Sequence, residues 1–335
     1  MRAVNLNNYG GTENFEVVDV SQPTPSEGEV LIRVGYAGLR WGDIMQRNGF
    51  PTRERVTPFI GGQEAAGVIE ATGPGVSADW KGRRVVAMVP NGAFGEYCVA
   101  AEQTLFDVPD SVSLDTALAY PINLRTAYML VYEWAKVQPG ETVLVHAAAG
   151  GVGHLAVQIM KRKLWDVRVI GIVSSKEKED LLLADGCDYT INRKTQDYVE
   201  EVNKICGPKF TGFKLGGQQG GGVDVSMNGV SGETLQRDPR VIRKRGRWVI
   251  YGYAGGRGEL DTSAYGYDGI TIMPFSSLAW LGTEADARAR TFVRDWLKTE
   301  RLVTPQVYKL EDVAKAQDDM EAGRTTGKVV FQISQ

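Results

Sequence analysis

The first third of the chain consists of short apolar runs separated by glycine, proline and serine. Runs of this length, bounded by turn-forming residues, predict β-strands joined by turns. We therefore expect a β-rich, barrel-like unit at the start of the chain. The predicted strands are 2–6, 15–20, 29–39, 64–73 and 82–89.

The pattern changes near Thr116, because apolar residues take on helical spacing over 114–137 before a proline and a glycine end the run. Apolar runs and helical segments then alternate, which predicts right-handed βαβ units stacked into a parallel sheet. The expected strands are 142–149, 167–175, 188–192, 222–228, 247–252 and 270–275, with helices at 152–163 and 176–186.

The last part of the chain predicts helices over 284–302 and 310–323 and a closing strand over 327–334. A closing strand of this kind can pair back into the first unit and make that unit discontinuous. A chain of 335 residues also exceeds what one simple core supports. We therefore expect an α/β protein with a doubly wound, parallel Rossmann domain over 124–295 and a barrel domain formed by 1–123 and 296–335.

Composition limits the partners that the protein is expected to have. The net charge is −3, and basic and acidic residues are interspersed, which predicts no binding to nucleic acid or to an anionic membrane. No apolar segment is long enough to span a bilayer. The N-terminal residues lack the order of a signal peptide, so a cytoplasmic location is expected.

The inventory of metal-ligating side chains is small. The cysteines lack paired spacing, which argues against a disulfide framework and against a zinc knuckle. Both histidines flank a glycine-rich turn, and we expect them to be structural. The cysteines are Cys98, Cys187 and Cys206, and the histidines are His146 and His154.

Two further segments have unusual composition. We interpret the basic run Arg243–Trp248 as a helix end with Gly246 in the left-handed cap, with polyanion binding as the less favoured alternative. The glycine-rich run 216–222 precedes a strand, whereas a phosphate cradle precedes a helix. We therefore expect a surface loop there.

The strongest chemical signal is a glycine-rich turn between a strand and a helix. Ala148, Gly150 and Gly153 fit the dinucleotide fingerprint G-x-G-x-x-G with alanine in the first place. A helix that begins at such a turn offers free N–H groups to a pyrophosphate. The predicted cofactor contacts in this turn are Ala149, Gly150, Gly151, Val152 and Gly153.

The next strand indicates which dinucleotide binds. NAD sites usually end this strand with an acid for the ribose 2′-hydroxyl, whereas this chain has Ser174, Ser175 and Lys176. Two hydroxyls and an ammonium suit a 2′-phosphate, so NADPH is favoured. Arg193 after the third strand could add a second cation, although an ordinary surface arginine is equally compatible with the pattern.

Taken together, these residues resemble the zinc-free quinone oxidoreductase branch of the medium-chain dehydrogenase/reductase superfamily. The matching motifs include PSEGEVLIRVGYAGL, GGQEAAGVIEATGPGV, TAYMLVYEWAKVQPGETVLVHAAAGGVG and TTGKVVF. The middle of the chain is most similar to the quinone-reductase-like proteins related to the vesicle amine transport protein. The resemblance implies a GroES-like catalytic domain, a Rossmann domain, an active-site cleft between them and a homodimer.

The same resemblance argues against zinc. Arg40 and Gln63 stand where zinc-dependent relatives have a cysteine and a histidine, and neither replacement ligates zinc well. Without a Lewis acid, the expected reaction is hydride transfer from NADPH to an acceptor already activated by conjugation, such as a quinone, an enone or an enal.

The resemblance also implies further site residues. Similar proteins hold the cofactor with a threonine, with backbone near a YGY segment and with a glycine and a lysine of the last strand. The corresponding residues here are Thr126, Gly252, Gly327 and Lys328, and Asn192, Tyr253 and Phe275 complete the predicted cofactor set.

Two departures from the family pattern concern catalysis. Arg40 replaces the asparagine that quinone reductases commonly have near the nicotinamide, and local pairing with Asp43 is its alternative role. Phe50 replaces a tyrosine of many relatives, so Tyr253 and Tyr128 become the candidate proton donors.

Two other functions stay open. An enoyl-thioester reductase would need a cation for a carrier phosphate, a task for Arg47, Arg53 or Arg55. A nucleotide-binding scaffold without turnover is the second, because Arg40 stands in the nicotinamide region.

Overall fold

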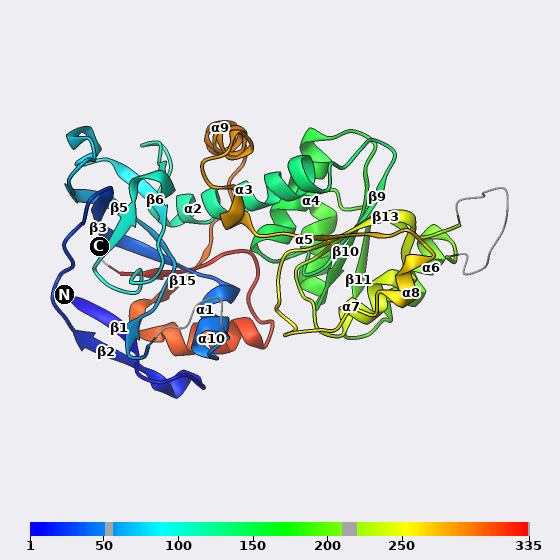
Figure 1. Ribbon diagram of the computed structural model, residues 1–335, viewed down its shortest axis with the longest axis horizontal. Helices are drawn as coiled ribbons and strands as arrows, with labels where there is room; N and C mark the ends of the chain where they lie inside the picture. The colour runs from blue at the N-terminus through cyan, green and yellow to red at the C-terminus, as the bar shows by residue number, and fades with distance from the viewer. Residues whose placement is uncertain (51–55, 210–219, 334–335) are drawn as a thin grey trace. The chain divides into compact units, whose positions relative to one another are not determined.

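The computed structural model describes residues 1–50, 56–209 and 220–333. The chain forms two compact units, each visible in Figure 1. Unit 1 comprises Met1–Arg125 and Ala287–Gln335, and unit 2 comprises Thr126–Asp286. Both ends of the chain therefore belong to unit 1. Among the described residues, no helix is both long and apolar enough to cross a membrane.

Unit 1 is a β-barrel-like unit built around a long central strand, β3 (Glu29–Leu39). β3 pairs antiparallel with β5 (Glu64–Thr72), with β7 (Tyr97–Ala101) and with the closing strand β16 (Val329–Gln332). The closing strand thus pairs back into the first unit, as its sequence predicts. The sheet order is β15-β16-β3-β5-β6-β8, which adds β15 (Gln306–Lys309), β6 (Arg84–Met88) and β8 (Leu105–Asp107).

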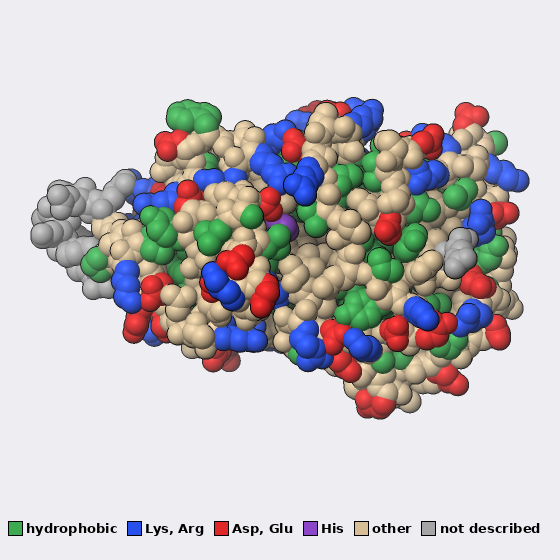
Figure 2. Space-filling model, turned by 180° about the vertical axis from the view of Figure 1, so that it is seen from behind, with side chains coloured by type: hydrophobic (Ala, Val, Ile, Leu, Met, Phe, Trp, Pro, Cys, Tyr) green, Lys and Arg blue, Asp and Glu red, His purple; other side chains and the backbone are tan. Residues whose placement is uncertain are grey.

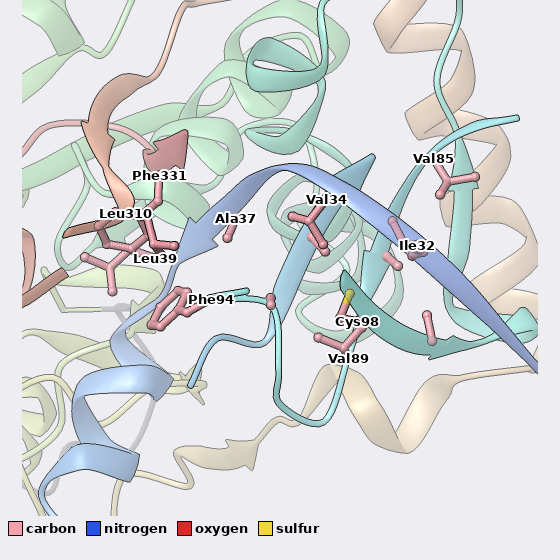
Figure 3. Close-up of a cluster of buried hydrophobic side chains, with 14 of the residues drawn as sticks. Ile32, Val34, Ala37, Leu39, Val85, Val89, Phe94, Cys98, Leu310 and Phe331 are labelled. Carbon is pink, nitrogen blue, oxygen red and sulfur yellow. The ribbon is translucent and has the colours of Figure 1, made fainter. Parts of the chain in front are cut away.

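A smaller sheet and a shared core complete the strands of unit 1. The small sheet has the order β2-β1-β4, formed by Phe15–Asp19, Arg2–Leu6 and Phe59–Ile60. Alternate residues of the large sheet point into one apolar core, drawn in Figure 3. Phe94 and Phe331 meet edge to face there, with ring centroids 5.1 Å apart. Burial of this apolar surface is the main stabilising contribution to the unit.

The helices of unit 1 are short except for one near the end of the chain. Their bounds are α1 Trp41–Arg47, α2 Leu114–Leu118, α9 Glu284–Thr299 and α10 Val313–Glu321, with 3-10 turns at Thr12–Asn14, Ala78–Trp80, Glu102–Thr104 and Leu310–Asp312. α9 begins within unit 2, and α3 (Pro121–Tyr128) crosses the other boundary.

Unit 2 is a Rossmann-type domain with a six-stranded parallel sheet in the order β11-β10-β9-β12-β13-β14. The strands are β9 Thr142–Val145, β10 Arg168–Val173, β11 Tyr189–Asn192, β12 Val223–Asn228, β13 Ile242–Ile250 and β14 Thr271–Pro274. The helices are α4 Gly151–Lys163, α5 Lys176–Ala184, α6 Tyr198–Cys206, α7 Thr234–Arg237 and α8 Ser263–Gly266, with 3-10 turns at Asp238–Arg240 and Ser277–Trp280.

The helical region expected over 114–137 is divided into three pieces. α2 ends before Tyr120, α3 begins at Pro121, and a π-helix follows over Met129–Trp134. Pro121 lacks a backbone N–H and cannot continue a helix, but it is well suited to the first position of a new one. A single proline therefore explains the first break.

The interpretation of Arg243–Trp248 as a helix end is wrong, because the run lies in β13. Gly246 does not adopt the left-handed conformation, which Arg245 adopts instead with φ of 60°. The pairing of β13 with β12 is irregular before Arg247, and Trp248 is fully buried. Burial of the apolar end of the run thus favours a strand inside the sheet. The basic residues of the run lie at the start of β13, where the pairing with β12 is irregular.

Acidic and basic side chains are interspersed on the face of the molecule seen in Figure 2. The glycine-rich run 216–222 lies mostly outside the described residues, and so do Arg53 and Arg55.

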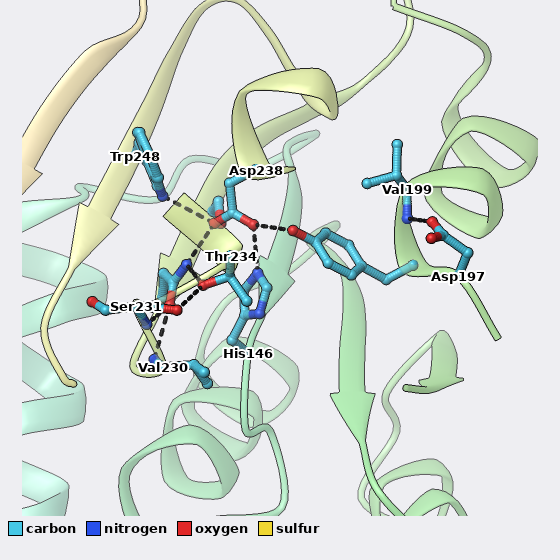
Figure 4. Close-up of polar contacts among 11 residues, drawn as sticks. His146, Asp197, Val199, Val230, Ser231, Thr234, Asp238 and Trp248 are labelled. Atoms are coloured by element: carbon cyan, nitrogen blue, oxygen red, sulfur yellow. Dashed lines mark hydrogen bonds and ion pairs between the residues drawn. The ribbon is translucent and has the colours of Figure 1, made fainter. Parts of the chain in front are cut away.

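One buried carboxylate connects several elements of unit 2 (Figure 4). Asp238 is fully buried and accepts hydrogen bonds of 2.8 to 2.9 Å from five side chains. Burial alone would raise the pKa of this carboxyl, but His146 and the hydroxyl and amide donors outweigh burial and hold the pKa below its usual range. The donors are His146, Tyr198, Ser226, Asn228 and Trp248.

The Asp238 network predicts a large stability effect. Asp238→Asn replaces one acceptor oxygen by an amino group, which faces donors and leaves them unpaired. We expect a loss of at least about 3 kcal/mol in the free energy of unfolding, measured by urea titration with tryptophan fluorescence. Asp197→Asn is the control, because Asp197 caps the start of α6 and pairs with Arg237 at the surface, and a cap contributes about 1 kcal/mol and an exposed pair at most about 1 kcal/mol. Equal stability of the two variants would contradict this account.

Candidate functional site

The glycine-rich turn joins β9 to α4, where the sequence places it. Gly150 precedes the first helical residue and has no side chain to cap the helix. Within the described part of the chain, the backbone N–H groups of Gly151, Val152 and Gly153 have no acceptor. Free N–H groups at the start of a helix form an anion-binding site, so the turn fits a pyrophosphate.

The glycines of this turn are required by close packing. A Cβ atom on Gly153 would lie 2.5 Å from the carbonyl oxygen of Ala147, and one on Gly150 would lie 3.1 Å from the same atom. Any side chain at Gly153 would therefore push α4 away from β9. Ala149, the remaining predicted contact of the turn, is almost completely buried.

Hydroxyls and cations gather at the end of β10, together with the Glu177 carboxylate, whose pKa is lowered by a hydrogen bond from the Ser175 side chain. Ser174 is buried, and Lys178 Nζ donates to its Oγ at 3.3 Å. The Arg193 N–H donates to the carbonyl of Val173, which brings Arg193 next to Ser174. Burial, together with the positive charges of Lys194 and Arg193, lowers the pKa of Lys178. This clustering of cations suits a phosphate group.

Lys176 forms its ion pairs outside this cluster, and its contact with the cofactor stays a prediction. Its Nζ pairs with Asp180 at 2.7 Å and with Glu179 at 3.6 Å on the exposed side of α5. Lys178 lies in the cluster, because a residue four positions after Ser174 lies one helical turn away on the same side. Ser175 precedes the first residue of α5 as its N-cap. The missed signal was therefore this i, i+4 spacing.

Asn192 is used within its own turn. Its side-chain oxygen accepts the N–H of Lys194 at 3.1 Å, and its backbone N–H donates to Gln196 Oε1 at 2.9 Å. These bonds shape the loop after β11 that presents Arg193.

The loops after β12 and β13 approach each other closely at Gly252. Ser231 Oγ donates to the Gly252 carbonyl at 2.7 Å, and a Cβ on Gly252 would lie 2.4 Å from the carbonyl oxygen of Gly229. Asn228 holds the first loop, because its Oδ1 accepts the N–H groups of Val230 and Ser231. No sequence motif indicated that Asn228 and Ser231 position this backbone.

The other predicted residues of unit 2 lie on separate elements. Thr126 and Tyr128 belong to α3, and the Tyr128 hydroxyl lies 3.5 Å from Glu133 Oε1. Tyr253 is partly exposed, and Phe275 follows β14, with its N–H bonded to the carbonyl of Ile250. Since the strands are parallel, the turn at 149–153, Ser174, Arg193, Gly252 and Phe275 all follow carboxyl ends at one edge of the sheet.

A second group of predicted residues meets in unit 1. Lys328 Nζ forms a buried ion pair with Glu64 Oε2, and Arg40 Nε lies 3.4 Å from Glu64 Oε1. Glu64 is fully buried at the start of β5, and Lys328 immediately precedes β16. Gly327 adopts the left-handed conformation with φ of 65° and turns the chain into this strand. Gln63 is adjacent, since its Oε1 would lie 3.1 Å from a Cβ on Gly42.

The expected local pair between Arg40 and Asp43 takes a different form. The Asp43 carboxylate accepts the backbone N–H of Arg40 at 2.8 Å, which caps the start of α1. The guanidinium, which has no acceptor atom, pairs with Glu64 from another strand instead. Arg40 therefore joins a charged cluster, defined here as Arg40, Asp43, Glu64 and Lys328.

Asp43 titrates unusually in this cluster. Burial raises the pKa of its carboxyl to about 7, against the opposing effect of Arg40 and of the backbone hydrogen bond from Arg40. Its Oδ1 has no hydrogen-bond partner within the part of the chain that the structure describes. At neutral pH the carboxyl is therefore only partly ionised.

Lys328 is less accessible than its expected cofactor role requires. Its side chain is 4% exposed, and its amine is already engaged by Glu64. The described residues also contain no group of three or more His, Cys, Asp or Glu side chains that could hold a metal ion.

Comparison with known families identifies both units. Residues 26–110 match the alcohol dehydrogenase GroES-like domain, and residues 151–289 match the zinc-binding dehydrogenase family. The first match spans β3 to β8 of unit 1, and the second spans β10 to β14 of unit 2.

Three curated relatives are similar over most of their length. The human quinone oxidoreductase is 30% identical over 99% of this chain and 97% of its own. A Burkholderia 2-haloacrylate reductase is 35% identical over 75% of this chain and 73% of its own. The zebrafish (Danio rerio) synaptic vesicle membrane protein VAT-1 homolog is 31% identical over 98% of this chain and 69% of its own.

Solved structures agree with these relatives. A mycobacterial protein complexed with NADPH superposes with a TM-score of 0.88 at 30% identity and covers 99% of both chains. The Escherichia coli quinone oxidoreductase complexed with NADPH gives a TM-score of 0.86 at 25% identity over 99% of this chain and 100% of its own. The chain belongs to the quinone oxidoreductase branch of the medium-chain dehydrogenase/reductase superfamily and is an oxidoreductase of that type.

The titration of Asp43 predicts a pH-dependent stability. Between the usual pKa of 3.8 and the raised value of about 7, the folded protein keeps a proton that the unfolded chain releases. The free energy of unfolding relative to Asp43→Asn should therefore fall as pH rises through this window, by at most about 1.4 kcal/mol per pH unit, and level off above it.

Urea unfolding at several pH values from about 5 to about 8 measures this difference. Asp110→Asn is the control, because the Asp110 side chain is fully exposed and its removal should shift stability equally at each pH. Parallel pH profiles for wild type and Asp43→Asn would show that Asp43 is ionised throughout.

Proposed function

We propose that this protein transfers hydride from NADPH to a quinone or to the conjugated C=C bond of an enone or enal, without zinc. The observation that carries the proposal is the cation cluster at the end of β10, where Lys178 and Arg193 lie beside Ser174 and the first residue after the strand is this serine and not an acid. NADP-dependent enzymes need cations at this place, whereas NAD-dependent enzymes usually have an acid there.

The residues of unit 2 fit the whole cofactor. The N–H groups of Gly151, Val152 and Gly153 would receive the pyrophosphate, and Ser174 with Lys178 and Arg193 would receive the 2′-phosphate. When bound, NADPH supplies the hydride. The protein residues orient the cofactor, and the GroES-like unit, 1–123 with 296–335, supplies the acceptor site in our proposal.

Zinc independence rests on the chemistry of two side chains. Arg40 and Gln63 take the places of a cysteine and a histidine, and a guanidinium repels a metal cation. The acceptor must therefore be activated by its own conjugation. Both relatives named for a reaction, a quinone oxidoreductase and a 2-haloacrylate reductase, reduce acceptors of that kind by their names.

Two tyrosines stay candidates for the proton donor. Tyr253 is 43% exposed and follows Gly252, whose backbone is predicted to contact the cofactor. Tyr128 directs its hydroxyl toward Glu133 at 3.5 Å. We further propose that the protein acts in the cytoplasm as a homodimer, with a small-molecule partner and with neither a nucleic acid nor a membrane.

One of the three arginines that an enoyl-thioester reductase could use to bind a carrier phosphate is already engaged within the protein. Arg47 is buried and bonds to Gly10, Gln317 and Glu321, so its guanidinium is already satisfied by protein groups. The remaining two, Arg53 and Arg55, lie outside the described residues.

The proposed reaction predicts turnover without metal. We expect oxidation of NADPH, followed as the loss of its absorbance, with 1,4-benzoquinone or 9,10-phenanthrenequinone and without added metal, and much slower oxidation of NADH. Tight NADPH binding without oxidation by any quinone, enone or enoyl thioester would favour a binding scaffold. Stoichiometric zinc found by elemental analysis would refute zinc independence.

The position of Lys178 beside Ser174 predicts which cofactor the protein prefers. Lys178→Ala should weaken NADPH binding at least tenfold, because a hydrogen bond to a charged group contributes about 1.5–3 kcal/mol. NADH binding should hardly change. Lys176→Ala is the matched control on the same helix and should leave both affinities within about twofold. Fluorescence titration measures all affinities, and equal effects of the two variants would exclude Lys178 as the 2′-phosphate contact.

A further inference from the structure

The guanidinium of Arg40 is only partly used by the protein. Its side chain is 32% exposed, and its only ion pair in the described chain is the contact of Nε with Glu64 Oε1. Neither terminal nitrogen has a hydrogen-bond partner among residues 1–50, 56–209 and 220–333. Arg47, seven residues further on, uses all three nitrogens. The unpaired edge of Arg40 therefore distinguishes it from a structural arginine of the same unit.

In the charged cluster, the two cations Arg40 and Lys328 share one carboxylate, that of Glu64. Glu64 and Lys328 form a buried pair, with side chains 0% and 4% exposed. This pair is held tightly against β3, because a Cβ on Gly38 would lie 2.5 Å from Glu64 Oε2 and 2.9 Å from Lys328 Nζ. Lys328 therefore stays with Glu64, and the charge of Arg40 is left over.

Asp43 does not cancel this surplus. Its Oδ2 is occupied by the backbone N–H of Arg40 and not by the guanidinium. Because the carboxyl is buried, it is only partly ionised at neutral pH. A half-buried guanidinium without a full counter-charge is costly, and an anion that pairs with it from solvent repays that cost.

The shape of the unpaired edge indicates which anion fits. Two parallel N–H groups of a guanidinium match the two oxygens of a carboxylate in a bidentate pair. Glu64 holds the side chain by Nε, so little conformational freedom is left to lose on binding. A neutral carbonyl would need only one donor and would leave the charge uncompensated.

We propose that Arg40 binds the carboxylate of an anionic acceptor, so that the substrate class is conjugated carbonyl compounds with a carboxylate next to the reacting C=C bond. This inference rests on the proposed function, since it assumes that Arg40 faces the acceptor. In this proposal, Arg40 makes the enzyme prefer negatively charged acceptors over neutral ones.

The reaction balances with water as the proton source. The hydride of NADPH forms a new C–H bond at one carbon of the double bond, the π electrons move to the other carbon, and that carbon takes a proton from water. NADPH is oxidised to NADP⁺, and the C=C bond is reduced by two electrons. Pairing with Arg40 withdraws charge from the carboxylate and makes the double bond a better hydride acceptor.

A matched pair of acceptors tests the proposal. trans-4-Oxo-2-pentenoate and its methyl ester share the same enone and differ in one charge. We expect wild type to prefer the acid. In Arg40→Asn, kcat/KM for the acid should fall at least thirtyfold, mainly through KM, whereas the value for the ester should change less than threefold. Arg40→Lys keeps the charge without the planar fork and should be intermediate.

Arg33→Asn is the control variant, because Arg33 lies on the same strand β3 with a half-exposed side chain that pairs with Glu70. It should match wild type. A binding measurement without turnover uses the saturated acid 4-oxopentanoate and calorimetry with NADP⁺ present. Its affinity should weaken at least tenfold in Arg40→Asn, and NADPH affinity should stay within twofold.

The outcomes separate this inference from the proposed function. If kcat/KM in Arg40→Asn falls equally for the acid and the ester, or falls for neither, the proposed role of Arg40 is overturned. Reduction of the ester would still support the proposed function in that case. Weaker NADPH binding with an unchanged ratio of acid to ester would assign Arg40 to the cofactor and also overturn it. If no acceptor is reduced, the proposed function fails, and 4-oxopentanoate binding that is equal in wild type and Arg40→Asn overturns the inference independently.

Discussion

The buried ion pair between Glu64 and Lys328 is the constraint on which the charged side of unit 1 depends. A glutamate without access to water needs a partner, and the partner comes from the last strand of the chain. That strand reaches Glu64 only because β16 pairs with β3, which also pairs with β5. Lys328 forms the buried pair with Glu64, and among the described residues Arg40 contacts the same carboxylate only through Nε, at 3.4 Å. The position of Lys328 thus limits how much of the Glu64 carboxylate is left for Arg40.

Unit 2 stabilises a buried anion by a different method. Within the described ranges, the Asp238 carboxylate accepts hydrogen bonds from five side chains of several elements, none of them a lysine or an arginine. One donor, Asn228, uses its oxygen to hold the loop that carries Ser231, and Ser231 in turn holds the Gly252 carbonyl. The same network therefore supports the sheet and orders backbone at the edge where the dinucleotide is expected. Donors from several elements suit this task, because together they fix the position of the carboxylate and of the backbone bonded to it.

The choice between Lys176 and Lys178 illustrates how local geometry refines a motif. Both lysines follow Ser174 and Ser175 in the sequence, and a count of charges cannot separate them. The start of α5 at Lys176 places Lys178 one turn above Ser174, whereas Lys176 faces Asp180 on the outer side. The neighbouring strand then adds Arg193 and Lys194 through the parallel pairing of β10 with β11. Lys178, Arg193 and Lys194 are thus brought together from two loops, although the sequence shows them only as separate basic residues.

The sequence by itself determined the parts of this protein that depend on neighbouring residues. Apolar periodicity and turn residues located the main strands and helices, and the spacing of Gly150 and Gly153 located the phosphate turn, because both signals act within a few residues. Short strands such as β4 and β8 gave too few positions to detect, and the basic run in β13 was misread because burial of Trp248, not local charge, decides its conformation. Tertiary structure alone decided which charges meet. Glu64 and Lys328 are 264 positions apart, and no local pattern records that their pairing leaves Arg40 with a free edge.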